Sequence, residues 1–233
     1  MKVRAVIQAR MSSTRLRGKT LMPVADKALL RRVVETARKH PFIQEIVVAT
    51  SNNSADDPIE AYCQYLGISC IRGDKTDVFQ RYMLACAGLD EEDHLVRITA
   101  DNMFCRFDAT LEIFSSHINN KADYSAVEGL SHVVYEFIKV GAFNRILKQE
   151  IALNEYDREH VTPVFRKEEL GFRVQAFKPT ALKLKPELEK QLTVDTQADL
   201  HRIESLIEAL GVDEHNIDFD QIYHWLTSHP LDS

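Results

Sequence analysis

Eight residues near the start of the chain combine positive charge, hydroxyl groups and a glycine within ten positions. They are Arg10, Ser12, Ser13, Thr14, Arg15, Arg17, Gly18 and Lys19. Arginine offers a planar fork of donors that matches phosphate oxygens, and lysine offers a compact positive charge. A glycine lets the main chain turn closely around an anion. The segment therefore predicts a cradle for a polyphosphate, with a solvated basic loop as the alternative.

The tripeptide Gly18-Lys19-Thr20 also resembles the end of a Walker A loop. In that motif the first glycine would fall at Ser13, and the helix after the lysine would be interrupted by Pro23. We therefore reject the P-loop interpretation.

Two aspartates follow apolar segments elsewhere in the chain. Asp101 ends RITAD, and Asp195 lies in LTVDT just before a helical pattern. Carboxylates at such positions can bind Mg²⁺ through one or two oxygens, while water and phosphate complete the coordination. Aspartate is also favoured in turns and at helix starts. From the residues alone, both interpretations stay open.

Strands and helices alternate through the first half of the chain. The expected strands are 3–9, 45–50, 68–73 and 94–100, and the expected helices are 28–40, 57–67 and 77–88. Pro58 stands in the first turn of one helix and Gly67 at its end. This rhythm predicts an α/β fold with a doubly wound, mostly parallel sheet, in which ligands bind beyond the carboxyl ends of the strands. The basic segment follows the first strand and should lie there.

The second half is less regular. Helices are expected at 108–118, 141–149, 196–211 and 219–230, and strands at 123–127, 131–140 and 172–179. Thr196 and Asp199 predict a capping box. No repeat or flexible linker divides the chain, so we expect a single domain, 1–233, with a nucleotide-binding half at 1–105 and a sugar-binding and C-terminal half at 106–233.

The formal charge of −6 argues against nucleic acid as a partner, and a local basic patch on an acidic chain favours a small anion. No apolar run approaches bilayer length, so a membrane partner is not expected either. The cysteines Cys63, Cys70, Cys86 and Cys105 lack metal-binding spacing and predict free thiols in a reducing cytoplasm.

Several motifs together resemble one family. In order they are IQARMSSTRLRGKTL, EIVVATSNNSADDPI, RGDKTDVFQRY, VRITAD, YDREHVTP and LTVDTQADL, which extend from Val3 to about Leu210. They resemble the cytidylyltransferases that activate acidic sugars, such as CMP-KDO synthetase, CMP-sialic acid synthetase and, most closely, the group of spore coat polysaccharide biosynthesis protein F. The resemblance implies a glycosyltransferase-A-like single domain that transfers CMP from CTP to an acidic sugar in surface polysaccharide or glycan synthesis. It also implies Mg²⁺ and a homodimer.

The resemblance assigns roles to individual residues. The triphosphate would be held by Arg10, Arg15 and Lys19, and the metal by Asp101 and Asp195. Arg72 and Gly73 would approach the base or ribose, supported by Asp77 and Arg81, and Ser51 and Asn52 are further candidates for nucleotide contacts. The acceptor sugar would lie near Glu136, Arg158, Glu159 and His160. The residues also allow two structural alternatives in these segments. Asp77 could pair with Arg81 one helical turn later, and Asp157 could cap a helix that carries the acceptor-side residues.

The chain departs from the family pattern at three places, of which the last lies on the acceptor side. Arg17 replaces a proline, Asn102 and Met103 replace a Cys-Pro pair, and SHVVYEFIKV replaces a segment that usually carries two acidic residues, of which Glu136 is left. The acceptor is therefore not specified. Two other functions share the fold: a nucleotide-sugar glycosyltransferase, which usually needs a D-x-D motif where this chain has DNMF, and a non-catalytic nucleotide-binding partner.

Overall fold

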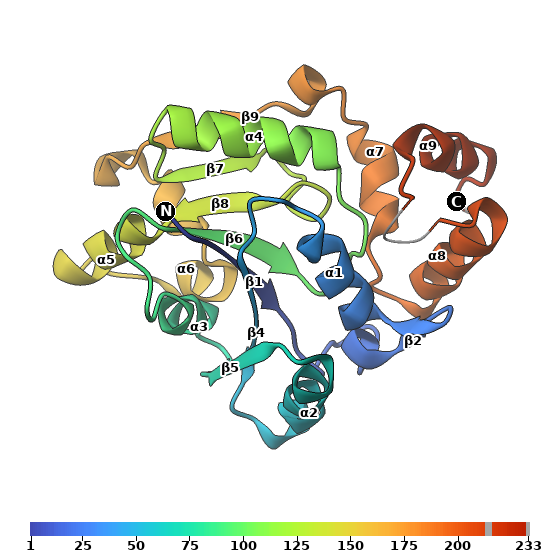
Figure 1. Cartoon of the computed structure of the whole chain (residues 1–233), viewed down its shortest axis with the longest axis horizontal. Coiled ribbons are helices and arrows are strands. Elements are labelled where there is room, and N and C mark those ends of the chain that lie inside the picture. The colour runs from blue at the N-terminus through green and yellow to red at the C-terminus, as the bar shows by residue number, and fades with distance from the viewer. Residues whose placement is uncertain (213–215, 232–233) are drawn as a thin grey trace.

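A seven-stranded sheet forms the centre of the protein, as the computed structural model of residues 1–212 and 216–231 shows (Figure 1). The strand order is β5-β4-β1-β6-β8-β7-β9. The strands are β1 (Val3–Gln8), β4 (Glu45–Ser51), β5 (Ser69–Gly73), β6 (His94–Thr99), β7 (Tyr124–Val127), β8 (Glu136–Lys139) and β9 (Val174–Phe177). Only β8 runs against the others in this sheet, so the prediction of a mostly parallel sheet is confirmed.

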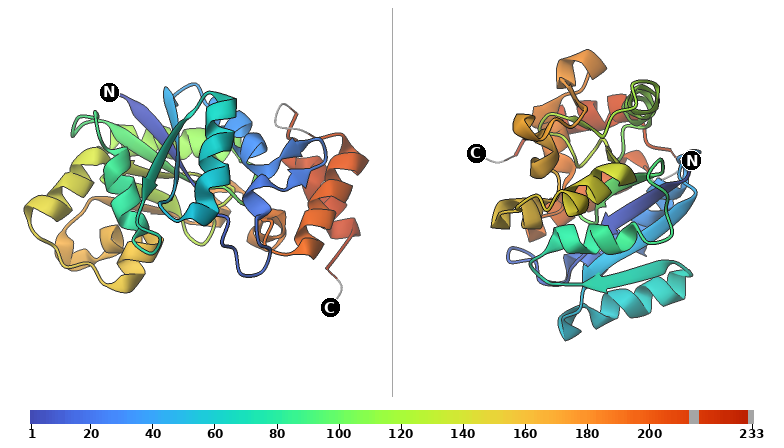
Figure 2. Two further views of the ribbon diagram at one scale, coloured as in Figure 1. Left: turned by 90° about the horizontal axis from the view of Figure 1, so that it is seen from below. Right: turned by 90° about the vertical axis from the view of Figure 1, so that its left-hand side faces the viewer.

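Helices cover both faces of the sheet (Figures 1 and 2). The helices are α1 (Leu29–Arg38), α2 (Asp57–Leu66), α3 (Val78–Ala85), α4 (Phe107–Asn119), α5 (Val140–Lys148), α6 (Glu155–His160), α7 (Pro186–Glu189), α8 (Gln197–Leu210) and α9 (Phe219–Ser228). Successive residues of β1 point to opposite faces. Ile7 packs in the core with α1, α2, α4 and the C-terminal helices, whereas Val6 packs in the core with α3 and α5. Both faces of β1 are therefore buried.

Helix ends follow the chemistry expected from the sequence. Pro58 lies in the first turn of α2, and Gly67 ends that helix in the left-handed conformation, φ 65°. The side chain of Thr196 accepts a hydrogen bond from Asp199 N–H, and the Asp199 carboxylate accepts one from Thr196 N–H, so the predicted capping box at α8 is confirmed. These local signals fix where α2 and α8 begin or end.

The expected strand at 131–140 is wrong in its first half. Strand β8 comprises only Glu136–Lys139, and the preceding residues form a buried loop in which Val133 and Val134 are fully covered. The main-chain carbonyl of Val133 accepts a hydrogen bond from Arg106 N–H instead of a strand partner. Apolar side chains packed in a loop produce the same sequence pattern as a strand, and this explains the error.

The segment around 157–166 also differs from expectation. Residues 157–160 lie within α6 itself, and Asn154 is the cap, with Asp157 as the third helical residue of a capping box. The next segment is only the short 3-10 helix η3 (Pro163–Arg166).

All four cysteines are free thiols, three of them buried and Cys70 half-buried. Burial raises the pKa of the Cys86 and Cys105 thiols to about 12. Among the helices of residues 1–212 and 216–231, none is long and apolar enough to cross a membrane.

Candidate nucleotide and metal site

Lys19 joins the two aspartates that the sequence singles out. Its ammonium group donates to Asp101 Oδ2 at 3.2 Å, to Asp195 Oδ1 at 2.8 Å and to the Val194 carbonyl at 2.7 Å. The lysine side chain is only 11% exposed. Three charged or carbonyl oxygens satisfy the three donors of a buried ammonium group, which explains why burial of this charge is tolerated. Asp101 and Asp195 therefore lie beside one another, as the sequence interpretation requires.

Local structure places the lysine at this point. Gly18 has φ 78°, the left-handed conformation that glycine adopts readily, and its N–H donates to the Met11 carbonyl at 2.9 Å. This bond closes the loop after β1 and begins η1 (Lys19–Leu21), a 3-10 turn instead of the helix that a P-loop would need. Thr20 Oγ1 donates to the Arg10 carbonyl at 2.9 Å and ties the turn to the start of the loop.

The aspartates are fixed by their main chains. Asp101 follows β6, the strand next to β1, and its carbonyl accepts a 2.8 Å hydrogen bond from Val194 N–H. Asp195 N–H then donates to Asp199 Oδ2 at 3.0 Å at the start of α8. Both carboxylates consequently point to the carboxyl edge of the sheet, where parallel α/β proteins bind ligands.

A first cavity of about 200 Å³ opens at this point. Its lining includes Gln8, Arg10, Ser13, Thr14, Arg15, Lys19, Thr99, Asp101 and Asp195. Arg15 contacts Asp195 Oδ2 at 3.0 Å, but its side chain is 64% exposed, so water weakens this ion pair and the guanidinium can turn to a ligand. Gln8 Oε1 is buried without a hydrogen-bond partner. The cavity therefore combines three cations, Arg10, Arg15 and Lys19, with the unpartnered carbonyl oxygen of Gln8 and two carboxylates.

The carboxylates of this cavity can hold Mg²⁺ only together with a phosphate ligand. Within residues 1–212 and 216–231, no group of three His, Cys, Asp or Glu side chains could hold a metal. Magnesium is commonly held by one or two carboxylates, with phosphate oxygens and water completing its octahedron. Asp101 and Asp195 match that pattern.

A second cavity, about 300 Å³, lies beside the first. It is lined by Ser12, Ser13, Thr14, Arg17, Ser51, Asn53, Ala55, Asp56 and Lys75. Asp56 is 2% exposed and accepts a 2.7 Å hydrogen bond from Met11 N–H and another from the Ser51 hydroxyl. This carboxylate, which the sequence interpretation missed, anchors the loop after β1 to the end of β4.

Three predicted nucleotide-binding residues have structural partners instead. Arg72 binds Asp57 and Glu60 and the carbonyls of Ser51 and Asn53, so its guanidinium is occupied. Gly73 packs on α3, where an added Cβ would lie 2.7 Å from Gln80 Oε1 and 2.8 Å from Arg81 Cγ.

Asp77 accepts from Gln80 N–H as the cap of α3 and pairs with Arg158. The Asp77–Arg81 alternative is wrong, because Arg81 is buried and directed at the Ala49 carbonyl. Arg72, Gly73 and Asp77 line neither of these two cavities, and their role at the nucleotide stays a prediction.

A third cavity of about 390 Å³ contains Glu136 and His160. It is lined by Arg97, Val127, Gly129, Ser131, Glu136, Tyr156, His160, Thr162, Pro163 and Arg166. Glu136 is 1% exposed and accepts from Arg97, Tyr124, Thr162 and Arg166. Burial and this carboxylate raise the pKa of Tyr124, so its hydroxyl stays protonated and donates. Glu136 therefore holds neighbouring donors in place and has few lone pairs left for a substrate.

The other two acceptor-side candidates lie outside this lining. Arg158 is directed to Asp77 and links α6 to α3, and Glu159 is exposed. Instead the structure adds Arg97 and Arg166, which the sequence interpretation did not name. The sequence contains a signal for Arg97, because an arginine inside the apolar run HLVRIT needs a buried partner. In the structure that partner is Glu136, its neighbour on the adjacent strand.

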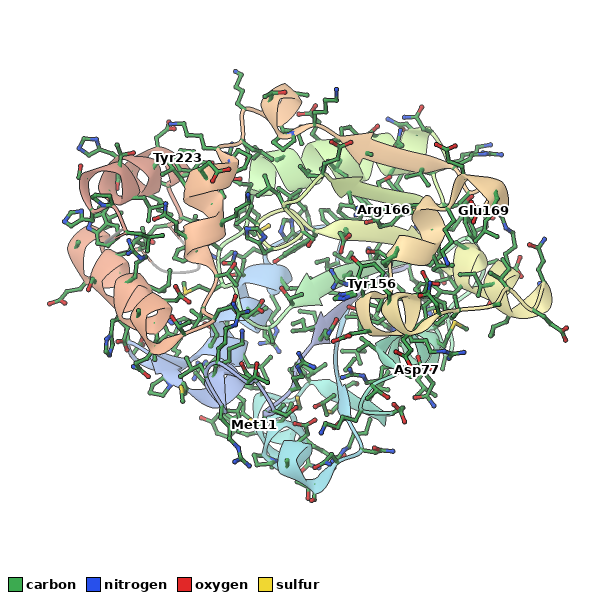
Figure 3. All side chains as sticks on the ribbon, turned by 180° about the vertical axis from the view of Figure 1, so that it is seen from behind. Met11, Asp77, Tyr156, Arg166, Glu169 and Tyr223 are labelled. Carbon is green, nitrogen blue, oxygen red and sulfur yellow. The ribbon has the colours of Figure 1, made fainter. Side chains whose placement is uncertain are left out.

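The three cavities follow the strand order along one edge of the sheet. The second uses Ser51 at the end of β4, the first uses Gln8 and Thr99 from β1 and β6, and the third uses Arg97 and Glu136 from β6 and β8. In Figure 3, Met11, Tyr156 and Arg166 are labelled along this side of the molecule. Figure 2, left panel, shows the loop after β1 and helix α6 projecting beyond the same edge of the sheet. The first two cavities share Ser13 and Thr14, and the third lies farther along the same edge; we call the three together the edge groove.

This mostly parallel sheet with a cation–carboxylate site at its carboxyl edge is a nucleotidyltransferase-like fold. A family model described as cytidylyltransferase matches residues 4–221, so the chain belongs to the cytidylyltransferase family.

Relatives of this chain cover nearly its whole length. It is 31% identical to the uncharacterized protein MJ1063 of Methanocaldococcus jannaschii, over 99% of this chain and 92% of that protein. It is 29% identical to the spore coat polysaccharide biosynthesis protein SpsF of Bacillus subtilis, over 88% of this chain and 86% of SpsF.

Two solved structures show the same fold. A cytidylyltransferase from Leptospira borgpetersenii superposes with a TM-score of 0.82 at 24% identity, covering 99% of this chain and 95% of that one. A CMP:2-keto-3-deoxy-manno-octonic acid synthetase complexed with CTP has a TM-score of 0.67 at 15% identity, covering 90% and 99%.

Proposed function

We propose that this protein transfers CMP from CTP to the hydroxyl of an acidic sugar of the 3-deoxy-ulosonic or sialic type, with release of pyrophosphate and with Mg²⁺ as cofactor. The observation that carries the proposal is the convergence of Lys19 with Asp101 and Asp195 in a polar cavity at the end of β1. Membership of the cytidylyltransferase family supports the same reaction. The CTP in the structure of a relative with this fold supports CTP as the donor.

Each cavity of the edge groove would bind a different part of the substrates. The second cavity would take the nucleoside, the first the triphosphate and the third the acceptor. In the reaction, the acceptor oxygen forms a bond to the α-phosphorus, the bond from that phosphorus to the pyrophosphate oxygen breaks, and the acceptor hydroxyl loses its proton. Such transfers depend mainly on positioning and on stabilising the developing charge.

Each group in the first cavity has a part in this chemistry. Arg10 and Arg15 would bind the phosphate oxygens and stabilise the negative charge of the leaving pyrophosphate, and Lys19 would join them when a metal takes its place beside Asp101 and Asp195. Asp101 and Asp195 would hold Mg²⁺, which when bound supplies further charge neutralisation at the phosphates. His160 in the third cavity would bind the acceptor hydroxyl and accept its proton.

The glycosyltransferase alternative is not favoured by the residues after Asp101. Asn102 is buried and its side chain accepts a 2.8 Å hydrogen bond from Phe104 N–H, while Met103 lies in the core. A second carboxylate of a D-x-D motif has no counterpart there.

A pyrophosphate-release screen tests the proposal. Each nucleoside triphosphate is combined with Mg²⁺ and a panel of 3-deoxy-ulosonic acids. We expect release only with CTP and an acidic sugar, and its near loss in Asp101→Ala. Faster release with UTP, or with a hexose 1-phosphate, would overturn the assignment. The expected homodimer and cytoplasmic location stay predictions, and size-exclusion chromatography with light scattering tests the former.

A further inference from the structure

Two of the four cysteines face each other where α2 packs on β5. Cys63 lies on α2 and is fully buried, whereas Cys70 lies on β5 and is half-buried. Strand β5 is at one edge of the sheet, and α2 lies beside it (Figure 1). Both side chains pack in the same core as Val48, the neighbour of Cys70 on β4. The two thiols therefore lie on the facing surfaces of one helix and one strand.

The chain between the two cysteines turns tightly and brings the sulfur atoms together. Gly67 ends α2, and the Ile68 N–H donates to the Cys63 carbonyl at 3.0 Å. The Cys63 thiol forms a hydrogen bond with the Cys70 sulfur, which raises the pKa of the Cys63 thiol, as does its burial, and lowers the pKa of the Cys70 thiol. Cys70 is therefore both the more accessible and the more reactive of the two.

This pair lies next to residues that shape the nucleotide side of the edge groove. Arg72 follows two residues after Cys70 and binds two carboxylates in the first turn of α2, at 2.7 and 2.8 Å. Asp56, which directly precedes α2, lines the second cavity and accepts the hydrogen bond from Met11 N–H. A shift of α2 relative to β5 would therefore move the carboxylate that anchors the loop after β1.

We propose that Cys63 and Cys70 form a reversible disulfide that weakens the binding of CTP. The effect on CTP rests on the proposed function. The sulfur atoms of a disulfide are about 2.05 Å apart, which is closer than two thiols can approach without a bond. Oxidation therefore draws α2 toward β5, and Asp56 moves with the helix relative to Met11. Where thiols are normally kept reduced, the disulfides that do form are usually transient and redox-sensing.

A low-molecular-weight disulfide such as glutathione disulfide supplies the oxidising equivalents. The Cys70 thiol loses its proton, and its sulfur attacks one sulfur of glutathione disulfide, whose S–S bond breaks and releases one glutathione. Cys63 then loses its proton, attacks the Cys70 sulfur of the mixed disulfide and releases the second glutathione. Two protons and two electrons pass from the protein thiols to two glutathione thiols, and one disulfide remains in the protein.

Peptide mapping by mass spectrometry after incubation with glutathione disulfide tests the disulfide. Wild type should contain a Cys63–Cys70 disulfide and no attached glutathione. Cys86 and Cys105 should stay reduced, because burial raises the pKa of each thiol to about 12. Cys63→Ser should retain one glutathione on Cys70, since the thiol that would release it is gone. Cys70→Ser should stay unmodified, because Cys63 is fully buried. Cys86→Ser is the matched control and should form the disulfide as wild type does.

Isothermal titration of CTP in the presence of Mg²⁺ measures the consequence for the nucleotide. We expect the oxidised wild type to bind CTP roughly tenfold more weakly than the reduced protein, because the loop after β1 is displaced. Dithiothreitol should restore the affinity. Cys70→Ser should bind CTP equally well before and after exposure to glutathione disulfide.

The outcomes separate this inference from the proposed function. Free thiols at Cys63 and Cys70 after oxidation, glutathione retained on wild-type Cys70, or an unchanged CTP affinity of the oxidised protein each overturn the inference and leave the proposed function in place. A CTP affinity that falls on oxidation, with no pyrophosphate release from any acid, overturns the proposed function alone. Failure of the reduced protein to bind CTP overturns both.

Discussion

The main-chain N–H of Val194 donates a 2.8 Å hydrogen bond to the carbonyl of Asp101, so the two carboxylate-bearing loops are joined by their backbones. Substitution of either aspartate side chain therefore leaves the loops in register. This relationship allows the chemistry of the site to be tested separately from its fold.

Asp101→Asn and Asp195→Asn should each lower kcat by roughly 10²–10³-fold, because each removes a negative charge that stabilises a cation beside the transferred phosphate. Isothermal titration with Mn²⁺ in the presence of CTP should show weaker metal binding, while the melting temperature changes little. Glu112→Gln, on the exposed side of α4, is the matched charge-neutralising control. Unchanged metal affinity in both aspartate variants would show that these residues do not hold the cation.

Lys19→Met should make the fold dependent on a divalent cation. Without the ammonium group, Asp101 loses its ion-pair partner and Asp195 keeps only the exposed Arg15. Loss of one partner from a buried ion pair commonly costs about 3–5 kcal/mol. Because Lys19 is 11% and the aspartates 27–29% exposed, water reduces that cost.

Urea unfolding of Lys19→Met with and without Mg²⁺ measures this dependence. A metal that binds only the folded state stabilises it by mass action. We expect the free energy of unfolding to rise with Mg²⁺ more in the variant than in wild type. Equal Mg²⁺ responses would contradict a shared site for the lysine and the metal.

Acid should destabilise the protein through a buried histidine pair. His94 Nδ1 lies 3.0 Å from His117 Nε2, and His117 Nδ1 lies 2.7 Å from Ser125 Oγ. The pKa of His94 is lowered to about 4 and that of His117 to about 3. Burial is the main cause for both, and the charge of nearby Lys139 contributes to both. An unfolded histidine has a pKa of about 6.5, so between pH 6.5 and 4 the unfolded chain binds more protons than the folded one.

Stability is therefore lost as the pH falls through that window, by about 1.4 kcal/mol per pH unit for each such histidine. Urea unfolding at pH 7.5, 6 and 5 measures the slope. His117→Gln should have a shallower slope than wild type, whereas His224→Gln, exposed on α9, should match wild type. Equal slopes in all three proteins would rule out the pair as the source of acid sensitivity.

Glu189→Ala should destabilise the protein by about 1–3 kcal/mol, because it leaves the buried Tyr223 hydroxyl without its acceptor, while Arg106 keeps its ion pair with Asp108. The Glu189 side chain is fully buried, accepts from the Tyr223 hydroxyl and lies 3.4 Å from Arg106, which itself donates to Tyr223 at 2.7 Å. Glu187→Ala, on the same helix but 89% exposed, should change stability by less than about 0.5 kcal/mol. Denaturant midpoints that coincide for the two variants would contradict this role.

The sequence by itself determined the frame of the fold and the centre of the site. Alternating strand and helix patterns set the direction of β1, β4, β5 and β6, and parallel strands bring the segments after them to one edge. Lys19 belongs to the loop segment after β1 and Asp101 closely follows β6, so their meeting at one edge could be predicted from local patterns. Thr196, with Asp199 three residues later, likewise predicted the start of α8.

Only the tertiary structure decided which residues meet around Glu136. Arg97 and Glu136 became partners only when β8 paired against β6, and Arg166 reached them from a segment whose local pattern specified no regular strand or helix. Arg72, expected at the nucleotide, was bound instead by carboxylates of α2. The type of a residue and its neighbours in the chain show which hydrogen bonds and ion pairs it can make. Which of several distant partners it binds depends on the packing of the folded chain. That is why the meeting of Lys19 with Asp101 and Asp195 could be predicted from the sequence, whereas the cluster of Arg97, Glu136 and Arg166 could not.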